Sequence, residues 1–358
     1  MHYQLLFLFG LAACSFAAYY EEQYEKLKQK FQQRNNNVVP TWKAIQFGMN
    51  PYFKDASEAA LKRLLGVKWR MLNISTPRVA SAEVSNGTSE LPAEFDARKQ
   101  WSYCKNIRYI KDQSNCGSCW AVSAASVMSD RYCIASKGRF QPFLSEEELV
   151  SCCRTCGDGC GGGFPEMAFV YWATRGVPTG RPYGSNNSCK PYTIKPCPTC
   201  VNTAETPKCQ HHCADGYKVP LSADRYFGKL YLRLLDRLLF FARTMPRNHP
   251  GEKGYSLRTE KEIMRDIYKH GPVVGAFIVY DDFFYYTDGI YQHHPGAQPV
   301  GAHAVRIIGW GKSSKPYWLI ANSWSETFGE KGLFRILRGT NECEIEGGVV
   351  AARARLPK

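Results

Sequence analysis

Apolar and polar positions alternate with different periods along this chain. Small and apolar residues fill positions 121–128 and predict a closely packed helix. Ser145 and Glu148 have the spacing of a capping box, which predicts the start of another helix. Residues 301–311 and 317–324 are apolar and β-branched and are separated by the turn-like GKSSKP. The last two segments therefore predict two strands that pair antiparallel.

The first 90 residues carry other patterns. Residues 5–13 form an apolar run too short to span a bilayer, and a small-residue site follows, which indicates a secretory signal at residues 1–17. Residues 19–34 have apolar side chains at helical spacing and predict an amphipathic helix, although a coiled-coil or surface helix has the same pattern. The polar stretch 76–90 is typical of an exposed linker suited to proteolytic removal. No stretch predicts a transmembrane helix.

Composition adds little until the cysteines are considered. The chain has 358 residues, 44% apolar content and a net charge of +14, which fits one large domain or two. The charge would suit an anionic partner, but Lys and Arg are scattered without a nucleic-acid motif, so we expect no nucleic-acid partner. Of 15 cysteines, the predicted signal removes Cys14 and leaves 14 in an exported chain. Most of these should be paired.

Four cysteines crowd among glycines in residues 152–163. A pair spaced like Cys153 and Cys156 is able to bind zinc. Export favours disulfides instead, because a metal site keeps its thiols reduced. We therefore expect no metal and no cofactor, whereas the zinc alternative predicts stoichiometric metal in purified protein.

The candidate chemistry centres on QSNCGSCWA, residues 113–121, which places Cys119 at the predicted start of a helix. A free thiol titrates near about 8.5, and a helix N-terminus and an imidazolium both lower that pKa. The two predicted strands should bring His303 and Asn322 into one neighbourhood. Taken singly, Gln113, His303 and Asn322 have plain interpretations as surface, core and turn residues. Together with Cys119, in this order, they favour a nucleophilic site.

At these residues the chain resembles the papain-like cysteine peptidases and, within them, the cathepsin B branch, through its C-G-S-C-W signature. The resemblance implies an α+β, two-lobed fold, with a helical lobe, a β-barrel-like lobe and the cleft between them. It implies a propeptide at residues 18–90, of which 41–50 and 61–69 run through the substrate cleft. The peptidase domain would then span residues 91–358.

The resemblance also assigns roles. Cys119 attacks the peptide carbonyl, and His303 protonates the leaving amine and then activates water. Asn322 orients the imidazole, and Trp324 shields their bond. The Gln113 side chain and the Cys119 N–H donate to the oxyanion.

Cysteine pairing and the lining of the cleft follow from the same resemblance. The implied bridges are Cys104–Cys133, Cys116–Cys160, Cys152–Cys209, Cys153–Cys156, Cys189–Cys213 and Cys197–Cys200. Cys119 and Cys343 stay unpaired. The implied substrate-binding residues are Gly162, Gly163, Phe164, Pro165, Ala276, Ala302, Trp324 and Gly348.

Two departures from the family bear on specificity. Gly348 stands where the family often has a glutamate, which predicts a preference for hydrophobic or aromatic P2 residues over Arg. Residues 197–200 are a short CPTC where the family has a longer loop with a His-His pair that binds the substrate's terminal carboxylate. His211 and His212 adjoin beyond that loop, where exposed filler is the favoured interpretation and a shifted anchor the alternative. We expect mainly endopeptidase action with reduced carboxydipeptidase activity.

Residues 230–253 have no counterpart in the family. Their apolar residues and arginines are compatible with a membrane-surface helix. An unremoved intron in the gene model is favoured, because so apolar a run is a liability on a secreted enzyme.

The remaining expectations concern partners and place. Sequons at Asn73, Asn86 and Asn186 suit a glycoprotein of the secretory pathway, lysosomal or extracellular. Residues 317–330 resemble gut peptidases of blood-feeding worms, which suggests a parasitic or free-living nematode and a gut lumen. Expected partners are protein and peptide substrates, the chain's own propeptide and cystatin-type inhibitors, with a monomeric enzyme. A catalytically silent, disulfide-rich binding module is the alternative function.

Overall fold

The structure is a computed structural model. It describes residues 41–44, 53, 56, 58–68, 91–197, 202–229 and 255–357. The predicted signal, the amphipathic helix, the linker and the segment 230–253 lie outside these residues.

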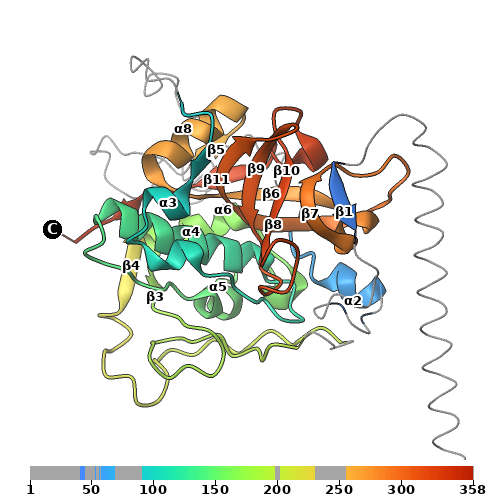
Figure 1. Ribbon diagram of the computed structural model, residues 1–358. Helices are drawn as coiled ribbons and strands as arrows, with labels where there is room; N and C mark the ends of the chain where they lie inside the picture. The colour runs from blue at the N-terminus through green and yellow to red at the C-terminus, as the bar shows by residue number, and fades with distance from the viewer. Residues whose placement is uncertain are drawn as a thin grey trace, which may run out of the picture.

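Helix α4 (Cys119–Ala135) forms the centre of the helical lobe (Figure 1). Residues 119–133 are all buried, which explains why the helix lacks a polar stripe. Its serines are satisfied internally, since Ser123, Ser126 and Ser129 each donate to the carbonyl four residues earlier at 2.6–2.7 Å. The predicted packed helix is confirmed.

The second predicted helix is α5 (Glu146–Cys152), and it begins as expected. Ser145 accepts a hydrogen bond from the Glu148 N–H at 3.0 Å, but its own N–H donates to Pro178. The Glu148 carboxylate contacts Lys190 and Arg225 instead. The capping box is thus only half formed, because two cations compete for its carboxylate. The rest of the lobe comprises α6 (Pro165–Thr174), η4 (Gly159–Gly161), β3 (Val177–Pro178), β4 (Arg225–Gly228) and β12 (Ala354–Arg355).

The β lobe is a nine-stranded sheet in the order β1-β7-β10-β9-β8-β6-β11-β5, with β2 also paired to β8. Its strands are β1 (Trp42–Ala44), β2 (Phe95–Asp96), β5 (Tyr255–Leu257), β6 (Val273–Tyr280), β7 (Tyr286–Tyr291), β8 (Pro299–Lys312), β9 (Pro316–Ala321), β10 (Leu333–Leu337) and β11 (Val349–Ala351). The helices and turns around it are α2 (Glu58–Arg63), α3 (Ala97–Gln100), η3 (Lys105–Arg108), α8 (Glu260–His270), η6 (Asp281–Tyr285) and η7 (Glu342–Glu344).

The predicted antiparallel pair is β8 with β9, whose register joins Lys312 to Pro316 across the turn. The expected barrel-like lobe needs correction, since no pair among the described strands joins β1 to β5. The described strands therefore form an open sheet with β1 and β5 at its two edges. The two-lobed α+β fold itself is confirmed.

Each lobe has its own core. The β-lobe core is aromatic, and the Phe283 ring lies 4.9 Å from Tyr291 and 5.0 Å from Phe334. The helical core is built on α4 and α6. A buried ion pair joins the lobes, from Arg306 of β8 to Asp130 of α4 at 2.8 Å. This ion pair therefore fixes the two lobes relative to each other at α4.

In the part of the chain that the structure describes, the disulfides join cysteines between residues 104 and 213. The structure contains Cys104–Cys133, Cys116–Cys160, Cys152–Cys209, Cys153–Cys156 and Cys189–Cys213, which match five of the implied pairings. The sixth involves Cys200, which lies outside the described residues. Cys119 and Cys343 are free and buried.

Candidate active site

His303 lies on β8, and Asn322 directly follows β9. The pairing of these strands brings His303 Nε2 to 2.8 Å from Asn322 Oδ1. That oxygen also accepts the Ser323 N–H at 2.8 Å, so it is an acceptor and Nε2 carries the proton. His303 Nδ1 is buried and has no hydrogen-bond partner among the described residues. Its lone pair is thus available for a proton.

Aromatic rings enclose this imidazole. Trp324 stacks on His303 with ring centroids 4.5 Å apart, and Phe277 meets it edge-on at 6.0 Å. Burial lowers the pKa of His303 to about 4, although its bond to Asn322 opposes the shift. In this state the imidazole is neutral at pH 7.

Cys119 is the first residue of α4 and is fully buried. Its sulfur accepts a hydrogen bond from the Gly66 N–H at 3.2 Å. Burial raises the pKa of the Cys119 thiol to about 11, and hydrogen bonds from the N–H groups of Ala304 and Gly66 oppose that shift. Because Ala304 is the next residue after His303, α4 places the thiol against the part of β8 that carries the imidazole.

Gln113 supplies an oriented amide. Its Oε1 accepts the Ser323 hydroxyl at 2.7 Å, which fixes the direction of the Nε2 group. Nε2 then donates to the carbonyls of Cys116 at 2.8 Å and Leu64 at 2.9 Å. The amide therefore holds a carbonyl oxygen of another segment beside the thiol.

That other segment, residues 64–68, runs between the two lobes. The Val67 N–H donates to Ala302 of β8 at 3.2 Å. On the opposite side, the Gly163 N–H donates to Gly66 at 2.8 Å, and Val67 forms a parallel bridge with Gly163. A Cβ on Gly66 would lie 1.8 Å from the Gly117 oxygen, so only glycine fits here. The Cys119 sulfur thus contacts the Gly66 N–H. A peptide that is to be cleaved would have to present a carbonyl carbon at this position.

The preceding described residues bind the β lobe. β1 pairs with β7, where Trp42 lies opposite Gly289 (Figure 1). The Phe53 ring packs 5.4 Å from Trp324, which in turn covers the imidazole. The described residues of this region, 41–44, 53 and 64–68, therefore contact both the cleft and the β lobe beside it.

The predicted substrate-binding residues fall into groups. Gly163 and Ala302 contact the segment 64–68 directly from the two lobes. Ala276 on β6 donates its N–H to the Gly348 carbonyl at 3.2 Å, so these two predicted pocket residues adjoin. Gly162 has a φ of 99°, and a Cβ there would meet the Gly66 oxygen at 2.9 Å. The remaining three are Phe164 and Pro165 at the start of α6, and Trp324, which packs on His303.

Sequence reasoning missed Ser323 and Tyr192. Ser323 connects the two candidate groups, because its N–H binds Asn322 and its hydroxyl binds Gln113. The Tyr192 hydroxyl lies 2.9 Å from the hydroxyl of Ser118, the residue before Cys119, and donates to the Gln113 carbonyl at 3.0 Å. The position of Ser323 next to Asn322 was a signal in the sequence, whereas Tyr192 lies in a loop without periodicity.

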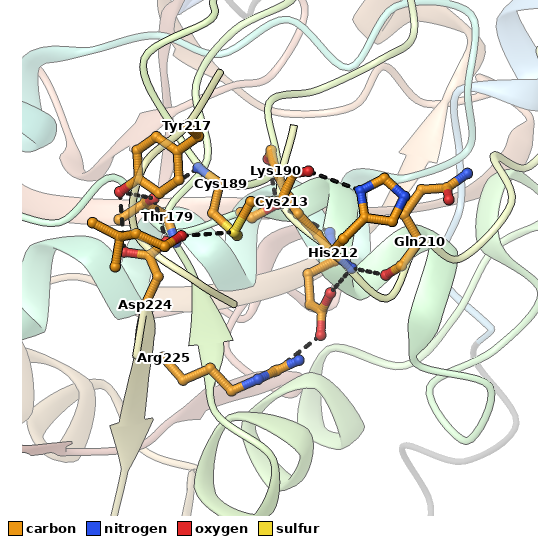
Figure 2. The surroundings of a disulfide bond; sticks show 12 residues. Thr179, Cys189, Lys190, Gln210, His212, Cys213, Tyr217, Asp224 and Arg225 are labelled. Atoms are coloured by element: carbon orange, nitrogen blue, oxygen red, sulfur yellow. Dashed lines mark hydrogen bonds and ion pairs between the residues drawn. A yellow bond between two sulfur atoms is a disulfide. The ribbon is translucent and has the colours of Figure 1, made fainter. Parts of the chain in front are cut away.

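The loop with His211 and His212 lies on the helical lobe. Figure 2 shows the Cys189–Cys213 bridge that holds it, with His212 Nδ1 at 2.9 Å from the Cys213 carbonyl. Both histidines are exposed. No described contact links either of them to the cleft residues.

Two lobes that place a buried cysteine against a histidine–asparagine pair define a cysteine peptidase. A family model described as papain family cysteine protease matches residues 91–227 and 244–353. The chain belongs to this family and is a hydrolase. Among the described residues, no helix is long and apolar enough to cross a membrane.

Within the family the chain groups with the cathepsin B-like proteinases. It is 45% identical over 328 residues to the cathepsin B-like cysteine proteinase of Schistosoma japonicum, covering 88% of this chain and 87% of the relative. It is 44% identical over 272 residues to the gut-specific cysteine proteinase of Caenorhabditis elegans, covering 75% of each chain. The solved proCathepsin B S9 from Trypanosoma congolense superposes with a TM-score of 0.72 at 34% identity, covering 92% of this chain and 97% of that one.

Proposed function

We propose that Cys119 is the nucleophile, with His303 as its acid and base and Asn322 as the residue that orients the imidazole. The observation that carries this assignment is His303 Nδ1, a buried nitrogen without a described hydrogen-bond partner on a ring whose other nitrogen is held at 2.8 Å by Asn322. A buried polar atom without a hydrogen-bond partner lowers the stability of a fold. Proton exchange with the Cys119 thiol gives His303 Nδ1 a function that accounts for this cost.

In the proposed reaction, His303 Nδ1 takes the thiol proton, and the Cys119 sulfur bonds to the peptide carbonyl carbon. The C–N bond breaks as the imidazolium returns its proton to the leaving amine. Water then gives its proton to His303, adds to the thioester and releases the acid and the thiol. The Gln113 Nε2–H and the Cys119 N–H stabilise both oxyanions.

The chain is made as a zymogen in this proposal, with a signal at residues 1–17, a propeptide at 18–90 and the enzyme at 91–358. Support comes from the Leu64 carbonyl, which occupies the Gln113 donor, and from the Gly66 N–H on the Cys119 sulfur. In this covered state both titrating groups are buried, which raises the pKa of the Cys119 thiol and lowers that of His303. The propeptide is therefore an inhibitor in this proposal, and both groups are neutral while it is bound.

We further propose that the enzyme is mainly an endopeptidase with a hydrophobic P2 preference. Support comes from Gly348, which brings no carboxylate to its pair with Ala276. His211 and His212 are exposed on a disulfide-held loop of the helical lobe. Mass spectrometry of a peptide with a free C-terminus tests the first part, and successive loss of dipeptides as the main pattern would refute it. For the second part, Gly348→Glu should raise turnover of Arg-Arg over Phe-Arg substrates relative to wild type.

The proposal extends to place and partners. The gut-specific relative supports a digestive role, with lysosomal or extracellular protein substrates. Asn186 is exposed and suits a glycan in the mature enzyme. We expect a monomer that binds cystatin-type inhibitors. Residues 230–253 remain a proposed non-family insertion, and the family model leaves 228–243 unmatched.

The experiment that separates a peptidase from a silent homologue is direct. Enzyme from which the propeptide has been removed should cleave an internally quenched peptide. Treatment with a thiol-alkylating reagent should then abolish this activity with first-order kinetics. A trimmed protein that has no measurable turnover at any pH from 4 to 8 would favour the binding module.

A further inference from the structure

A second cluster of cysteine, histidine and carboxylate lies in the β lobe. His293 follows β7, and Glu342 and Cys343 lie on η7, 49 residues further along the chain. Glu342 Oε1 is 2.6 Å from His293 Nδ1 and 3.3 Å from Cys343 Sγ, and the nitrogen and the sulfur are 3.8 Å apart. Three different kinds of ligand atom thus form one small triangle.

The dimensions of the triangle suit one metal ion. Zinc binds thiolate sulfur at about 2.3 Å, and imidazole nitrogen and carboxylate oxygen at about 2.0–2.2 Å. Ligands of a tetrahedral ion at these bond lengths lie about 3.3–3.6 Å from each other. The sulfur–oxygen and sulfur–nitrogen separations of 3.3 and 3.8 Å are close to this spacing. The nitrogen–oxygen pair at 2.6 Å would need to open by under one ångström.

The loop that carries two of these side chains is held independently of them. The Glu346 carboxylate accepts the N–H groups of Gly339 at 2.6 Å and Asn341 at 3.0 Å, and also the Trp318 indole at 2.9 Å. The Asn341 side chain in turn accepts the Glu346 N–H at 2.9 Å. The backbone that presents Glu342 and Cys343 is therefore preorganised.

The loop also keeps an uncommon conformation. Asn341, Cys343 and Glu344 have positive φ values of 54°, 50° and 63°. Such a conformation is rare for cysteine and glutamate and persists only where the surroundings enforce it. Here it turns the Cys343 sulfur back towards the His293 ring.

The third side chain is oriented from both sides. The Tyr280 ring stacks on the His293 ring at a centroid distance of 4.2 Å. The backbone N–H of His293 donates to the Glu342 carboxylate at 3.0 Å. The His293 side chain is 37% exposed, compared with 10% for Glu342. Solvent thus has access to one side of the triangle, as a fourth ligand requires.

We propose that His293, Glu342 and Cys343 form a site for one zinc-like divalent cation, with solvent as the remaining ligand. Imidazole, thiolate and carboxylate are the donors of zinc, whereas calcium and magnesium prefer oxygen alone. The site is separate from the peptidase chemistry, since its described contacts do not include Cys119, His303 or Asn322.

Zinc binding by the full-length zymogen tests the proposal, because there the propeptide covers Cys119. After dialysis against micromolar zinc and then metal-free buffer, elemental analysis should find about one zinc per chain. Cys119→Ser should retain it, and so should the His211→Ala/His212→Ala double variant, which removes the exposed histidine pair. Cys343→Ser and Glu342→Gln should each weaken zinc affinity at least about 100-fold.

Folding and ligand identity are checked separately. The thermal midpoint of Glu342→Gln measured with a chelator should equal that of wild type under the same condition, which shows that metal loss is not unfolding. Cobalt substitution should give a thiolate-to-cobalt absorption band in wild type that is absent in Cys343→Ser. Equal zinc content in wild type, Cys343→Ser and Glu342→Gln would overturn the proposal, as would loss of zinc from Cys119→Ser. None of these outcomes depends on peptidase activity.

Discussion

Two cysteine–histidine pairs in one chain differ in their third partner. In the cleft, a neutral amide completes the set, since Asn322 holds one nitrogen of His303 and leaves the other without a described partner. In the β lobe, the Glu342 carboxylate contacts both His293 and the Cys343 sulfur. An amide orients an imidazole without adding charge, whereas a carboxylate is an acidic group that can bring a negative charge to its partners.

The causes that raise the two thiol pKa values differ accordingly. For Cys119 burial is the main cause, and the hydrogen bonds around it lower the value. For Cys343 burial comes first and the charge of Glu342 raises the pKa further. Removal of residues 64–68 would reverse the first effect but not the second. The reactivity of each thiol therefore depends on the segment that covers it and on the charge beside it.

The largest expected effect comes from exchanging each thiol for a hydroxyl. After trimming by an added protease, Cys119→Ser should lose about 10⁴-fold or more in kcat/KM, because the nucleophile is gone. Cys343→Ser should stay within about twofold of wild type. Fluorogenic peptide hydrolysis measures both, and comparable losses in the two variants would remove the distinction between the pairs.

Changing the third partner should have the next largest effect. Asn322→Ala leaves His303 without its orienting acceptor, and a misplaced catalytic group costs on the order of 100-fold in kcat. KM should change little, because the proposed role of Asn322 is to orient His303 and not to bind substrate. Glu342→Gln is the matched change in the other pair and should leave kcat unaltered. A loss confined to KM in Asn322→Ala would argue against an orienting role.

Weakening the contact of residues 64–68 should expose the Cys119 thiol and leave Cys343 unchanged. Gly66→Ala places a Cβ 1.8 Å from the Gly117 oxygen, so the segment cannot keep its position. Such a clash costs about 1–3 kcal/mol, or about 10- to 100-fold in inhibition of the enzyme by a propeptide added in trans. Gly161→Ala in the enzyme is the control, since its Cβ would meet Asp158 at 3.4 Å. Unchanged inhibition by the Gly66→Ala propeptide would contradict the described path of the segment.

The pH dependence of the cover follows from His303. Its pKa is about 4 in the covered state because the ring is buried. We expect the pKa to rise towards its ordinary value of 6.5 when the segment leaves and water reaches the ring. The uncovered state therefore binds more protons between these values, and acid favours it by up to about tenfold per pH unit. Propeptide affinity should fall as pH drops from about 6.5 to about 4 and level off below. Affinity that rises with acid over this interval would contradict the assignment.

The smallest effect concerns the hydrogen bond that connects Gln113 to Ser323. Ser323→Ala frees the Gln113 amide to rotate and should lower kcat/KM about three- to tenfold. Ser323→Thr keeps the hydroxyl and should restore part of the loss. The acid limb of the pH profile of kcat/KM should not move, since the hydrogen bond from the Ser323 N–H to Asn322 remains. Steady-state kinetics of the three enzymes decide the point.

Much of the catalytic arrangement was predictable because it depends on local pattern. The strands of His303 and Asn322 are apolar runs joined by a short turn, and their pairing follows from that alone. The α4 helix is signalled by its small residues. The half-formed capping box at Glu148 was not predictable, since its competitor Lys190 is 42 residues away.

The β-lobe cluster could not be predicted for the same reason. His293 and Glu342 are 49 residues apart and have no spacing that marks a metal site. They meet because η7 packs against β6, and the positive φ of Cys343 directs its sulfur towards His293. The two edges of a sheet also have no local signal, so the sequence did not show that the described strands leave the sheet open. Long-range packing decides such features.

Mass spectrometry of the activated enzyme after treatment with a thiol-directed epoxide tests directly whether Cys119 is the nucleophile. We expect one adduct per chain, on the tryptic peptide that contains Cys119, with Cys343 unmodified. We expect no adduct on the untrimmed zymogen at pH 7, because the Gly66 N–H occupies the sulfur. An adduct on Cys343, or labelling that persists undiminished in Cys119→Ser, would refute the assignment of Cys119.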